Sequence, residues 1–393
     1  MKRNAIYYFL FTLGIMSSAF SYQQNAGLYD KNLGRKTEIK KIDTDQEETK
    51  QMIQGYNKPA RIDVKGHWDF NVNVSFLYRY AVQKGLEIGQ RYSREIFPNG
   101  DFAYSDGHIK MDFDYHPAFR IGAGMNSTYD DWDINFYYTR FHSTDRKSEA
   151  TDPDLAWGLN YDYIEPTWFI YALLSPHTLR GIYSKGIWKL KTDIFDFELG
   201  RFACVGKKIS VRPFVCFRAG RIDQKYYNEF IGIRANDDEH TIVVNNKSDS
   251  WLVGPRGGFD TKWCLGKGFS LIGNASATLF YQKFKINIFQ EFLSSPVYPY
   301  NNTYVAKLKE HFINTNFEVS LALKWGKYFF NNKIFWDLLL GYDFVIFMNQ
   351  NMIRSFWNNV QTLGLLSAQH AHDDGNPNNL MFHGLVVTTK LDF

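Results

Sequence analysis

Hydrophobic and polar residues alternate along much of the chain after about residue 65. In residues 68–80 the even positions are aromatic or aliphatic, whereas the odd positions include Asp69, Asn71 and Arg79. A period of two residues is that of a β-strand with one apolar face and one wet face. The chain is therefore predicted to be all-β, with strands at 68–80, 109–121, 131–142, 186–201, 209–221, 251–263, 269–283, 312–325, 334–348 and 380–393.

Charged residues fill many of the wet positions, as in residues 108–121, where apolar side chains alternate with His, Lys, Asp and Arg. Charges at every second position are too costly for the interior of a β-sandwich, although a secreted sandwich or propeller stays the soluble alternative. Along 186–201 the apolar positions change from even to odd near Ile194 and Phe195. This change of phase predicts a β-bulge.

The links between the predicted strands alternate in length. Short links at 124–130, 202–208, 264–268 and 326–333 alternate with long ones at 81–107, 143–185, 222–250, 284–311 and 349–379. Short turns at one end and long loops at the other are typical of a transmembrane antiparallel barrel of the bacterial outer membrane, with the turns in the periplasm. Since the links 81–107 and 143–185 could each contain a further hairpin, we expect an even number of about ten to fourteen strands.

The last strand gives an independent argument for a barrel. Its alternate residues, ending in a C-terminal Phe, are apolar or β-branched and share one face, as is typical of the assembly signal of outer-membrane barrels. A closed barrel also leaves no strand edge unpaired, which protects such long, one-sided strands from aggregation. The residues of the expected signal are Leu385, Val387, Thr389, Leu391 and Phe393.

The N-terminus has the basic, apolar and small-residue order of a secretory signal peptide. Lys2 and Arg3 precede an apolar run over residues 6–16, and the small residues Ser17, Ser18 and Ala19 follow it. We expect cleavage after residue 19 or 21; an amphipathic surface helix is the weaker alternative. The predicted organisation is a signal peptide at 1–21, a charged periplasmic segment at 22–62 and the barrel at 63–393.

Composition narrows the class further. Aromatic residues make up 18% of the chain, yet 22% of residues are charged and the mean hydropathy is −0.37. No stretch supplies the roughly 20 apolar residues of a membrane helix, and the aromatic content excludes intrinsic disorder. The formal charge of +4, or +2 without Lys2 and Arg3, comes from interleaved signs and therefore predicts no nucleic-acid partner.

Three stretches resemble one family, the pore-forming major outer membrane proteins of Legionella type, which have relatives among chlamydia-like bacteria. They are residues 132–141 (WDINFYYTRF), 188–201 (WKLKTDIFDFELGR) and 211–226 (VRPFVCFRAGRIDQKY). The third is the most specific, with Arg212-Pro213, Gly220 and Asp223-Gln224 in the family's order. The resemblance covers about residues 60–393 and implies a β-barrel porin.

The phase of each strand predicts which side chains point into the lumen. Arg212, Arg218 and Arg256 are expected to form a basic wall opposite Asp112, Asp114, Asp131 and Asp133, which would give a transverse field that sorts ions. The alternative is that these charges neutralise one another and plug a narrow barrel. The full set of predicted pore-lining residues is Lys110, Asp112, Asp114, Arg120, Asp131, Asp133, Arg212, Arg218, Arg256, Glu318 and Lys324.

Aromatic residues near the strand ends fit the girdles of the two membrane interfaces, with core packing as the alternative. They include Trp68, Tyr80, Trp132, Trp251, Trp263, Trp325 and Trp336.

The chain contains only three cysteines. Cys204 and Cys264 fall near short turns at the same predicted end, two strands apart, so that a disulfide bridge between them is a possibility, whereas Cys216 lies mid-strand.

Enzyme motifs are sparse. No serine-hydrolase elbow, zinc-protease helix or phosphate loop is present. A His/Asp loop with His370, His372, Asp373 and Asp374 suggests a metal site or a rim hydrolase, but a solvated loop is the simpler interpretation.

The sequence therefore predicts an outer-membrane pore for passive diffusion of small hydrophilic solutes and ions, without cofactor, metal or enzymatic activity. Its expected partners are outer-membrane lipid, the barrel assembly machinery, its solutes and a possible second copy of the chain. The alternative is a structural or adhesive barrel that acts through its long extracellular loops.

Overall fold

The computed structural model describes residues 64, 69–127, 132–156, 160–168, 179–233, 239–293, 302–353 and 379–393. All of them belong to the second of two units, Asn57–Phe393. The expected signal peptide and charged segment lie outside these residues, as do Trp68, Asp131 and the His/Asp loop at 370–374.

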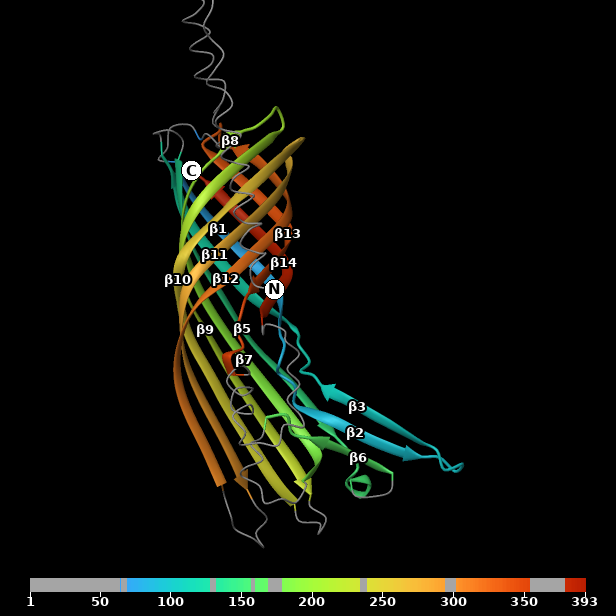
Figure 1. The fold of residues 1–393 in the computed structure, drawn as a ribbon. Helices are drawn as coiled ribbons and strands as arrows, with labels where there is room; N and C mark the ends of the chain where they lie inside the picture. Colours follow the sequence, from blue (N-terminus) through green and yellow to red (C-terminus); the bar gives the residue numbers. More distant parts are fainter. Residues whose placement is uncertain are drawn as a thin grey trace, which may run out of the picture. The chain divides into compact units, whose positions relative to one another are not determined.

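The described strands form a closed antiparallel barrel of ten strands (Figure 1). The first strand pairs on one side with the second barrel strand and on the other with the last, with Asn71 opposite Asp392, so that no edge remains. The expected all-β barrel with an even strand number is confirmed. In the order around the barrel, the strands are β1 (Phe70–Gln83), β4 (Tyr115–Asn126), β5 (Trp132–Ala150), β7 (Arg180–Arg201), β9 (Ile209–Ile233), β10 (Glu239–Gly266), β11 (Phe269–Leu293), β12 (Asn302–Phe329), β13 (Ile334–Phe347) and β14 (Leu380–Asp392).

Four further strands do not belong to the barrel wall. β2 (Gly89–Ile96) and β3 (Phe102–Ile109) form a hairpin that pairs with β6 (Tyr161–Glu165), and β6 touches β7 through Ile164 and Gly181. β8 (Ala203–Cys204) is a short addition to β9, and a single 3-10 turn, η1, spans Pro153–Leu155. Figure 1 shows the β2–β3 hairpin projecting from the side of the barrel near the end with the long links.

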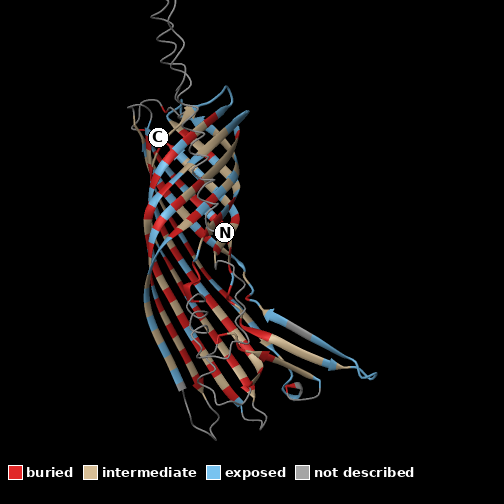
Figure 2. Cartoon of the chain, in the orientation of Figure 1, coloured by how far each residue is buried: buried red, intermediate tan, exposed pale blue. Residues whose placement is uncertain are grey.

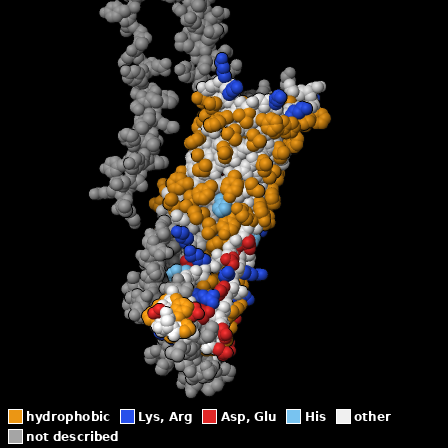
Figure 3. Space-filling view, turned by 90° about the vertical axis from the view of Figure 1, so that its right-hand side faces the viewer, with side chains coloured by type: hydrophobic (Ala, Val, Ile, Leu, Met, Phe, Trp, Pro, Cys, Tyr) orange, Lys and Arg blue, Asp and Glu red, His pale blue; other side chains and the backbone are white. Residues whose placement is uncertain are grey.

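Apolar side chains cover the outside of the barrel half that ends in the short turns. Val319, Leu321 and Leu340 are 55%, 58% and 57% exposed, although each is aliphatic. Figure 3 shows such side chains as a continuous hydrophobic band above a charged region. This inversion of the soluble pattern is that of a lipid-facing wall. In the described residues, no helix is long and apolar enough to cross a membrane.

Five strands continue far beyond the lipid-facing band. β7, β9, β10, β11 and β12 have 22 to 28 residues, whereas a strand needs only about 9–11 to cross a bilayer. In this extension the buried, inward side chains include large rings, such as those of Trp188 and Tyr226, together with amides such as Gln224, and many of the outward ones are charged. Figure 2 shows buried residues alternating with intermediate or exposed ones along these strands.

The prediction of a bulge at Ile194 and Phe195 is wrong, because β7 continues without interruption into the extension. The register of β7 with both neighbours is continuous through these residues, and it shifts only between Gly181 and Tyr183. The apolar side changes because the strand leaves the lipid, where its outer face becomes wet and its inner face forms a core. For the same reason, much of the predicted long loops at 222–250 and 284–311 is strand.

Candidate functional site: the charged barrel interior

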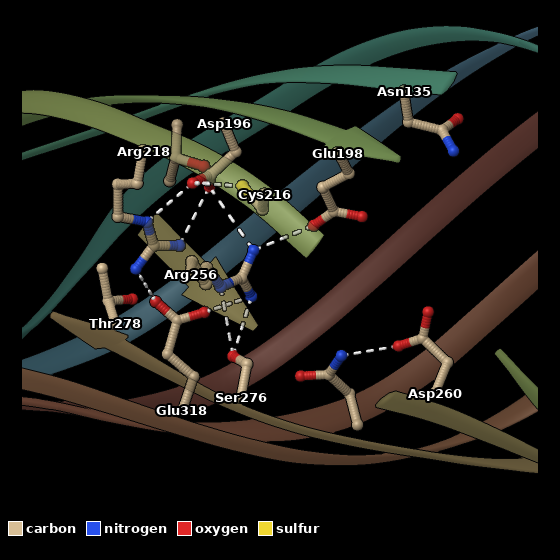
Figure 4. Close-up of polar contacts among 12 residues, drawn as sticks. Asn135, Asp196, Glu198, Cys216, Arg218, Arg256, Asp260, Ser276, Thr278 and Glu318 are labelled. Carbon is tan, nitrogen blue, oxygen red and sulfur yellow. Dashed lines mark hydrogen bonds and ion pairs between the residues drawn. The ribbon is translucent and has the colours of Figure 1, made fainter. Parts of the chain in front are cut away.

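The lipid-facing half of the barrel encloses a cluster of arginines and carboxylates. They lie at alternate, inward positions of β5, β7, β9, β10 and β12, because period two turns every second side chain towards the lumen. Figure 4 shows how side chains from these strands converge. The interior cluster consists of Asp133, Asp196, Glu198, Arg212, Arg218, Arg256, Asp260 and Glu318.

Arg218 is the most enclosed member, with 1% of its surface exposed. Its Nε donates to Asp196 Oδ1 at 2.6 Å and its Nη2 to Asp196 Oδ2 at 2.9 Å, a two-point contact that matches guanidinium to carboxylate. Its Nη1 donates to Asn316 Oδ1 at 2.7 Å and to Glu318. Every side of this guanidinium is therefore held by an acceptor.

Arg256 connects the carboxylates of β7 and β12. Its Nη1 donates to Glu198 Oε1 at 2.9 Å and its Nη2 to Glu318 Oε2 at 2.8 Å. Ser276 Oγ accepts from Nε and Nη2 at 3.1 and 3.0 Å. Glu318 thus bridges Arg218 and Arg256, and the ion pairs cross the lumen from β12 to β9 and β10.

Arg212 forms the end of the cluster nearer the short turns. Its Nε donates to both carboxylate oxygens of Asp133 at 3.0 and 2.9 Å, and its Nη1 donates to Asp260 at 2.8 Å and Glu198 at 3.2 Å. The ring of Phe214 lies between two guanidinium carbons, 5.4 Å from that of Arg212 and 5.2 Å from that of Arg256.

Smaller polar contacts line the neighbouring wall. Arg79 pairs with Asp343, Lys324 with Asp337, and Lys390 with Asp392 at 2.8 Å. Arg120 Nε donates to Thr139 Oγ1 at 2.8 Å.

A cavity of about 320 Å³ lies among these groups. It extends from Asn71 and Asp392, next to the short turns, to Arg256 and Glu318 in the cluster. Eight carboxylates and six basic side chains line it, and Arg79 and Arg218, which pair with the lining carboxylates Asp343, Asp196 and Glu318, balance the remaining two negative charges. The acidic lining is Asp133, Asp196, Glu198, Asp260, Glu318, Asp337, Asp343 and Asp392, and the basic lining is Arg120, Arg212, Arg256, Lys262, Lys324 and Lys390.

Side-chain amides form the next layer towards the long links. Gln83 donates to Gln224 at 2.8 Å across the barrel from β1 to β9, and Gln282 donates to Gln350 Oε1 at 2.9 Å. Residues 350–353 follow β13 and are buried in the interior. Beyond them, the buried rings of Trp168, Tyr226 and Phe230 belong to an apolar core that fills the extension.

The structure brings together five of the predicted pore-lining residues. Asp133, Arg212, Arg218, Arg256 and Glu318 all belong to the interior cluster. They do not form two separate walls, because each arginine is bonded to carboxylates of other strands. Arg120 and Lys324 line the cavity outside the cluster.

Three predicted pore-lining residues are placed differently. Lys110, Asp112 and Asp114 are exposed in the segment before β4, which begins only at Tyr115. Asp112 accepts from Lys147 Nζ at 2.9 Å, and this hydrogen bond raises the pKa of the Lys147 ammonium above its ordinary value. These side chains therefore lie at the outer rim of the barrel. The prediction that Asp112 and Asp114 face the arginines across the lumen is wrong.

Sequence reasoning missed several cluster residues, notably Asp196, Glu198 and Asp260. Asp196 and Glu198 flank Phe197 on β7, whose ring is exposed on the lipid-facing side. Because each carboxylate is next to an aromatic residue that faces the lipid, the alternation could have placed both carboxylates inside the barrel. The bulge assumed at Ile194 and Phe195 prevented this assignment.

The disulfide considered as an alternative for Cys204 and Cys264 is not formed, since all three cysteines are free. Cys204 pairs with Ser210, and Ser210 pairs in turn with Lys262 on β10, so that one whole strand separates Cys204 from Cys264. Two strand spacings amount to about 9–10 Å, beyond the roughly 4.4–6.8 Å between the Cα atoms of a disulfide.

The remaining predicted surface residues point outwards. Trp132, Trp251 and Trp263 are exposed on the outer wall, consistent with an interfacial girdle. The expected assembly signal, Leu385, Val387, Thr389, Leu391 and Phe393, also lies on the outer face of β14, and its role in assembly stays a prediction.

Comparisons with solved structures list outer-membrane barrels. The outer membrane protease OmpT from Escherichia coli is 10% identical, with a TM-score of 0.40 over 85% of this chain and 99% of that chain. A Pseudomonas aeruginosa FadL homologue is 7% identical, with a TM-score of 0.25 over 83% of this chain and 90% of that chain. No curated protein sequence matches significantly.

A family model gives the decisive comparison, because it matches residues 62–393 and so covers the whole barrel. Its description is "Legionella pneumophila major outer membrane protein precursor". The match agrees with the hydrophobic outer band and confirms the resemblance seen in the sequence. The chain is an outer-membrane β-barrel and belongs to the Legionella major outer membrane protein family.

Proposed function

We propose that this protein forms a narrow pore through which small ions and hydrophilic solutes diffuse passively. The observation that supports this most is the charged cavity inside the lipid-facing half. A ten-stranded barrel can be filled by its own side chains, as the apolar core of the extension shows. Burying three arginines instead carries a desolvation cost that apolar packing avoids, and a polar path explains why the sequence retains them.

The charge of the cavity lining sets the expected selectivity. Charged residues around a narrow, low-dielectric passage concentrate ions of the opposite sign. The eight carboxylates of the lining are balanced by its six basic groups together with Arg79 and Arg218, which pair with lining carboxylates, so we expect little preference between cations and anions.

The described conformation is closed on the side of the long links. Gln350 and Asn351 are buried in the interior, and Asn351 Nδ2 donates to Lys84 O at 2.8 Å and Gly85 O at 3.3 Å. Conduction therefore requires residues 350–353 to move aside, together with the part of the apolar core that lies beyond them. Asn351→Ala removes these bonds and should increase the time that the pore spends open.

Single-channel recording in planar bilayers tests the proposal, with ion selectivity measured from the reversal potential in a salt gradient. The pair of changes Asp260→Asn and Asp392→Asn leaves the cavity with two more basic groups than carboxylates and should shift the reversal potential towards a preference for anions. The pair Asp112→Asn and Asp114→Asn changes the net charge equally at the outer rim and is the matched control. It should leave the reversal potential unchanged.

A second candidate function is display of the extracellular region as a structural or adhesive barrel. The observation that favours it is the β2–β3 hairpin, which exposes Phe97, Phe102 and Tyr104 beside a closed barrel. A folded barrel that shows heat-dependent gel mobility but conducts nothing, with or without Asn351→Ala, would end the pore proposal and leave display as the function. Neither proposal includes catalysis or a cofactor.

A further inference from the structure

An open groove lies on the outer wall of the barrel extension. Its volume is about 410 Å³, and it runs across β7, β9 and β10. Along each strand, the residues that line the groove alternate with the buried residues Trp188, Tyr226 and Asn246. The lining side chains therefore point away from the barrel interior. The groove residues are Ile187, Lys189, Lys225, Tyr227, Asn245 and Lys247.

Three lysines of the groove form a single row across the strands. Lys189 is the register partner of Lys225, and Lys225 is the register partner of Lys247. Side chains directly opposite one another in a sheet have Cβ atoms about 4.5–5.5 Å apart, and like charges in such pairs are destabilising. A row of three ammonium groups is therefore unfavourable unless an anion lies among them.

No carboxylate of the described residues supplies that anion. None of the three lysines forms an ion pair or hydrogen bond within the part of the chain that the structure describes. Asp223 and Asp249 lie in the neighbouring row, two residues nearer the lipid-facing band, and Asp223 is already bound to Arg221 at 2.7 Å. On the other side of the groove, Glu229 is occupied by the Tyr227 hydroxyl.

Further lysines make the surroundings of the groove basic. Lys285 and Lys309 are register partners on β11 and β12, and Lys285 is also the register partner of Asp249, so that the neighbouring row holds three lysines, with Lys191, and two aspartates. With the three groove lysines, Lys285 and Lys309 form a belt of outward-facing lysines on five neighbouring strands. The other members of this lysine belt are Lys191, Lys283 and Lys307.

The height of the groove above the lipid-facing band identifies its partner. On β10, exposed Trp251 lies four residues from Lys247. Four residues span about 13 Å along a strand, or about 10 Å of height at the usual barrel tilt of about 40°. The groove lies at the end with the long links, which is the extracellular end in bacterial barrels. The groove therefore lies at the outer edge of the headgroup layer, and the basic surface reaches inwards from it to Lys283, the register partner of Trp251.

We propose that this groove binds the phosphate groups of a glycolipid in the outer leaflet of the same membrane. A phosphate offers acceptor oxygens to the three ammonium groups and to the Asn245 amide. The Tyr227 hydroxyl is already hydrogen-bonded to Glu229 and forms the border of the groove. The membrane presents such a lipid at the height of the groove and at high local concentration. Ile187 offers an apolar contact for the ring of a sugar.

Lipid binding by the purified, refolded full chain in uncharged detergent tests the proposal. The probes are bisphosphorylated lipid A and its dephosphorylated form. The groove variant is Lys189→Gln/Lys225→Gln/Lys247→Gln. The control variant removes the same charge from exposed lysines at the opposite end of the barrel: Lys207→Gln/Lys208→Gln/Lys333→Gln.

Bisphosphorylated lipid A should bind the wild type and the control variant equally. It should bind the groove variant on the order of 100-fold more weakly, about fivefold for each lysine. Heat-dependent gel mobility verifies that each variant is folded, and Lys225→Gln alone replaces the triple variant if that variant does not fold. Equal binding of the dephosphorylated lipid, undiminished binding by the groove variant, or displacement by millimolar inorganic phosphate alone would each overturn the proposal.

Discussion

Removal of Arg218 should destabilise the barrel more than removal of any exposed arginine. Arg218→Met keeps the length of the side chain but leaves Asp196 and Glu318 with Arg256 as their remaining arginine partner, at 3.8 and 2.8 Å. Both carboxylates are buried. Breaking a buried ion pair on one side costs about 3–5 kcal/mol, because the other charge remains desolvated.

A control on the same strand separates this cost from the general effect of losing an arginine. Arg221 is three residues away on the outer face, where its side chain is 62% exposed and contacts Asp223 at 2.7 Å. Exposed ion pairs contribute about 0–1 kcal/mol. Arg221→Met should therefore change the free energy of unfolding by no more than about 1 kcal/mol.

A double variant tests the assigned cause. Arg218→Met combined with Asp196→Leu removes the arginine together with Asp196, the carboxylate whose remaining arginine contact is the longer one, 3.8 Å. Replacing a whole buried pair by apolar groups is often neutral. The double variant should therefore be more stable than Arg218→Met alone. The measurement is urea unfolding and refolding in lipid vesicles, followed by tryptophan fluorescence. Equal losses for Arg218→Met and Arg221→Met, or a double variant less stable than the single one, would refute the reasoning.

Three further predictions concern the wall of the barrel. Gly254→Ala should destabilise it by roughly 1–3 kcal/mol, because the added Cβ would lie 2.1 Å from Leu279 O, whereas Gly257→Ala meets no atom closer than 4.0 Å and should be tolerated in the same urea assay. Val319→Arg should cost about 2–4 kcal/mol in lipid vesicles, since it places a charge in the hydrophobic band. A maleimide should label two thiols in the folded barrel and three in denaturant; the two are Cys204 and Cys264.

The barrel was predictable because its cause is local. A strand between lipid and a wet lumen must alternate, and the sequence around Phe76 or Val319 shows that alternation without any knowledge of partners. The alternation of short and long links then gave the two ends and the even strand number. These features depend only on positions near each other in the chain.

The interior cluster was only partly predictable, because its cause is not local. Period two correctly turned Arg212, Arg218 and Arg256 inwards, but it says nothing about which carboxylates of other strands they meet. Arg218 and Glu318 are one hundred residues apart in the chain. The pairing depends on strand order and on the stagger of neighbouring strands, and both follow from closure of the whole barrel.

The incorrect bulge prediction shows that the sequence of a strand indicates where the strand leaves the membrane. On β7, Phe195 and Phe197 face outwards and Trp188 and Leu190 face inwards, yet the register between them is continuous. A bulge would shift the facing of every later side chain, whereas here only the polarity of the two faces is exchanged. An exchange of faces without a turn signal therefore marks the level at which a strand leaves the lipid. Just beyond that level the outward positions of β7 become Asp193, Lys191 and Lys189, so that the lysine belt follows directly after the hydrophobic band.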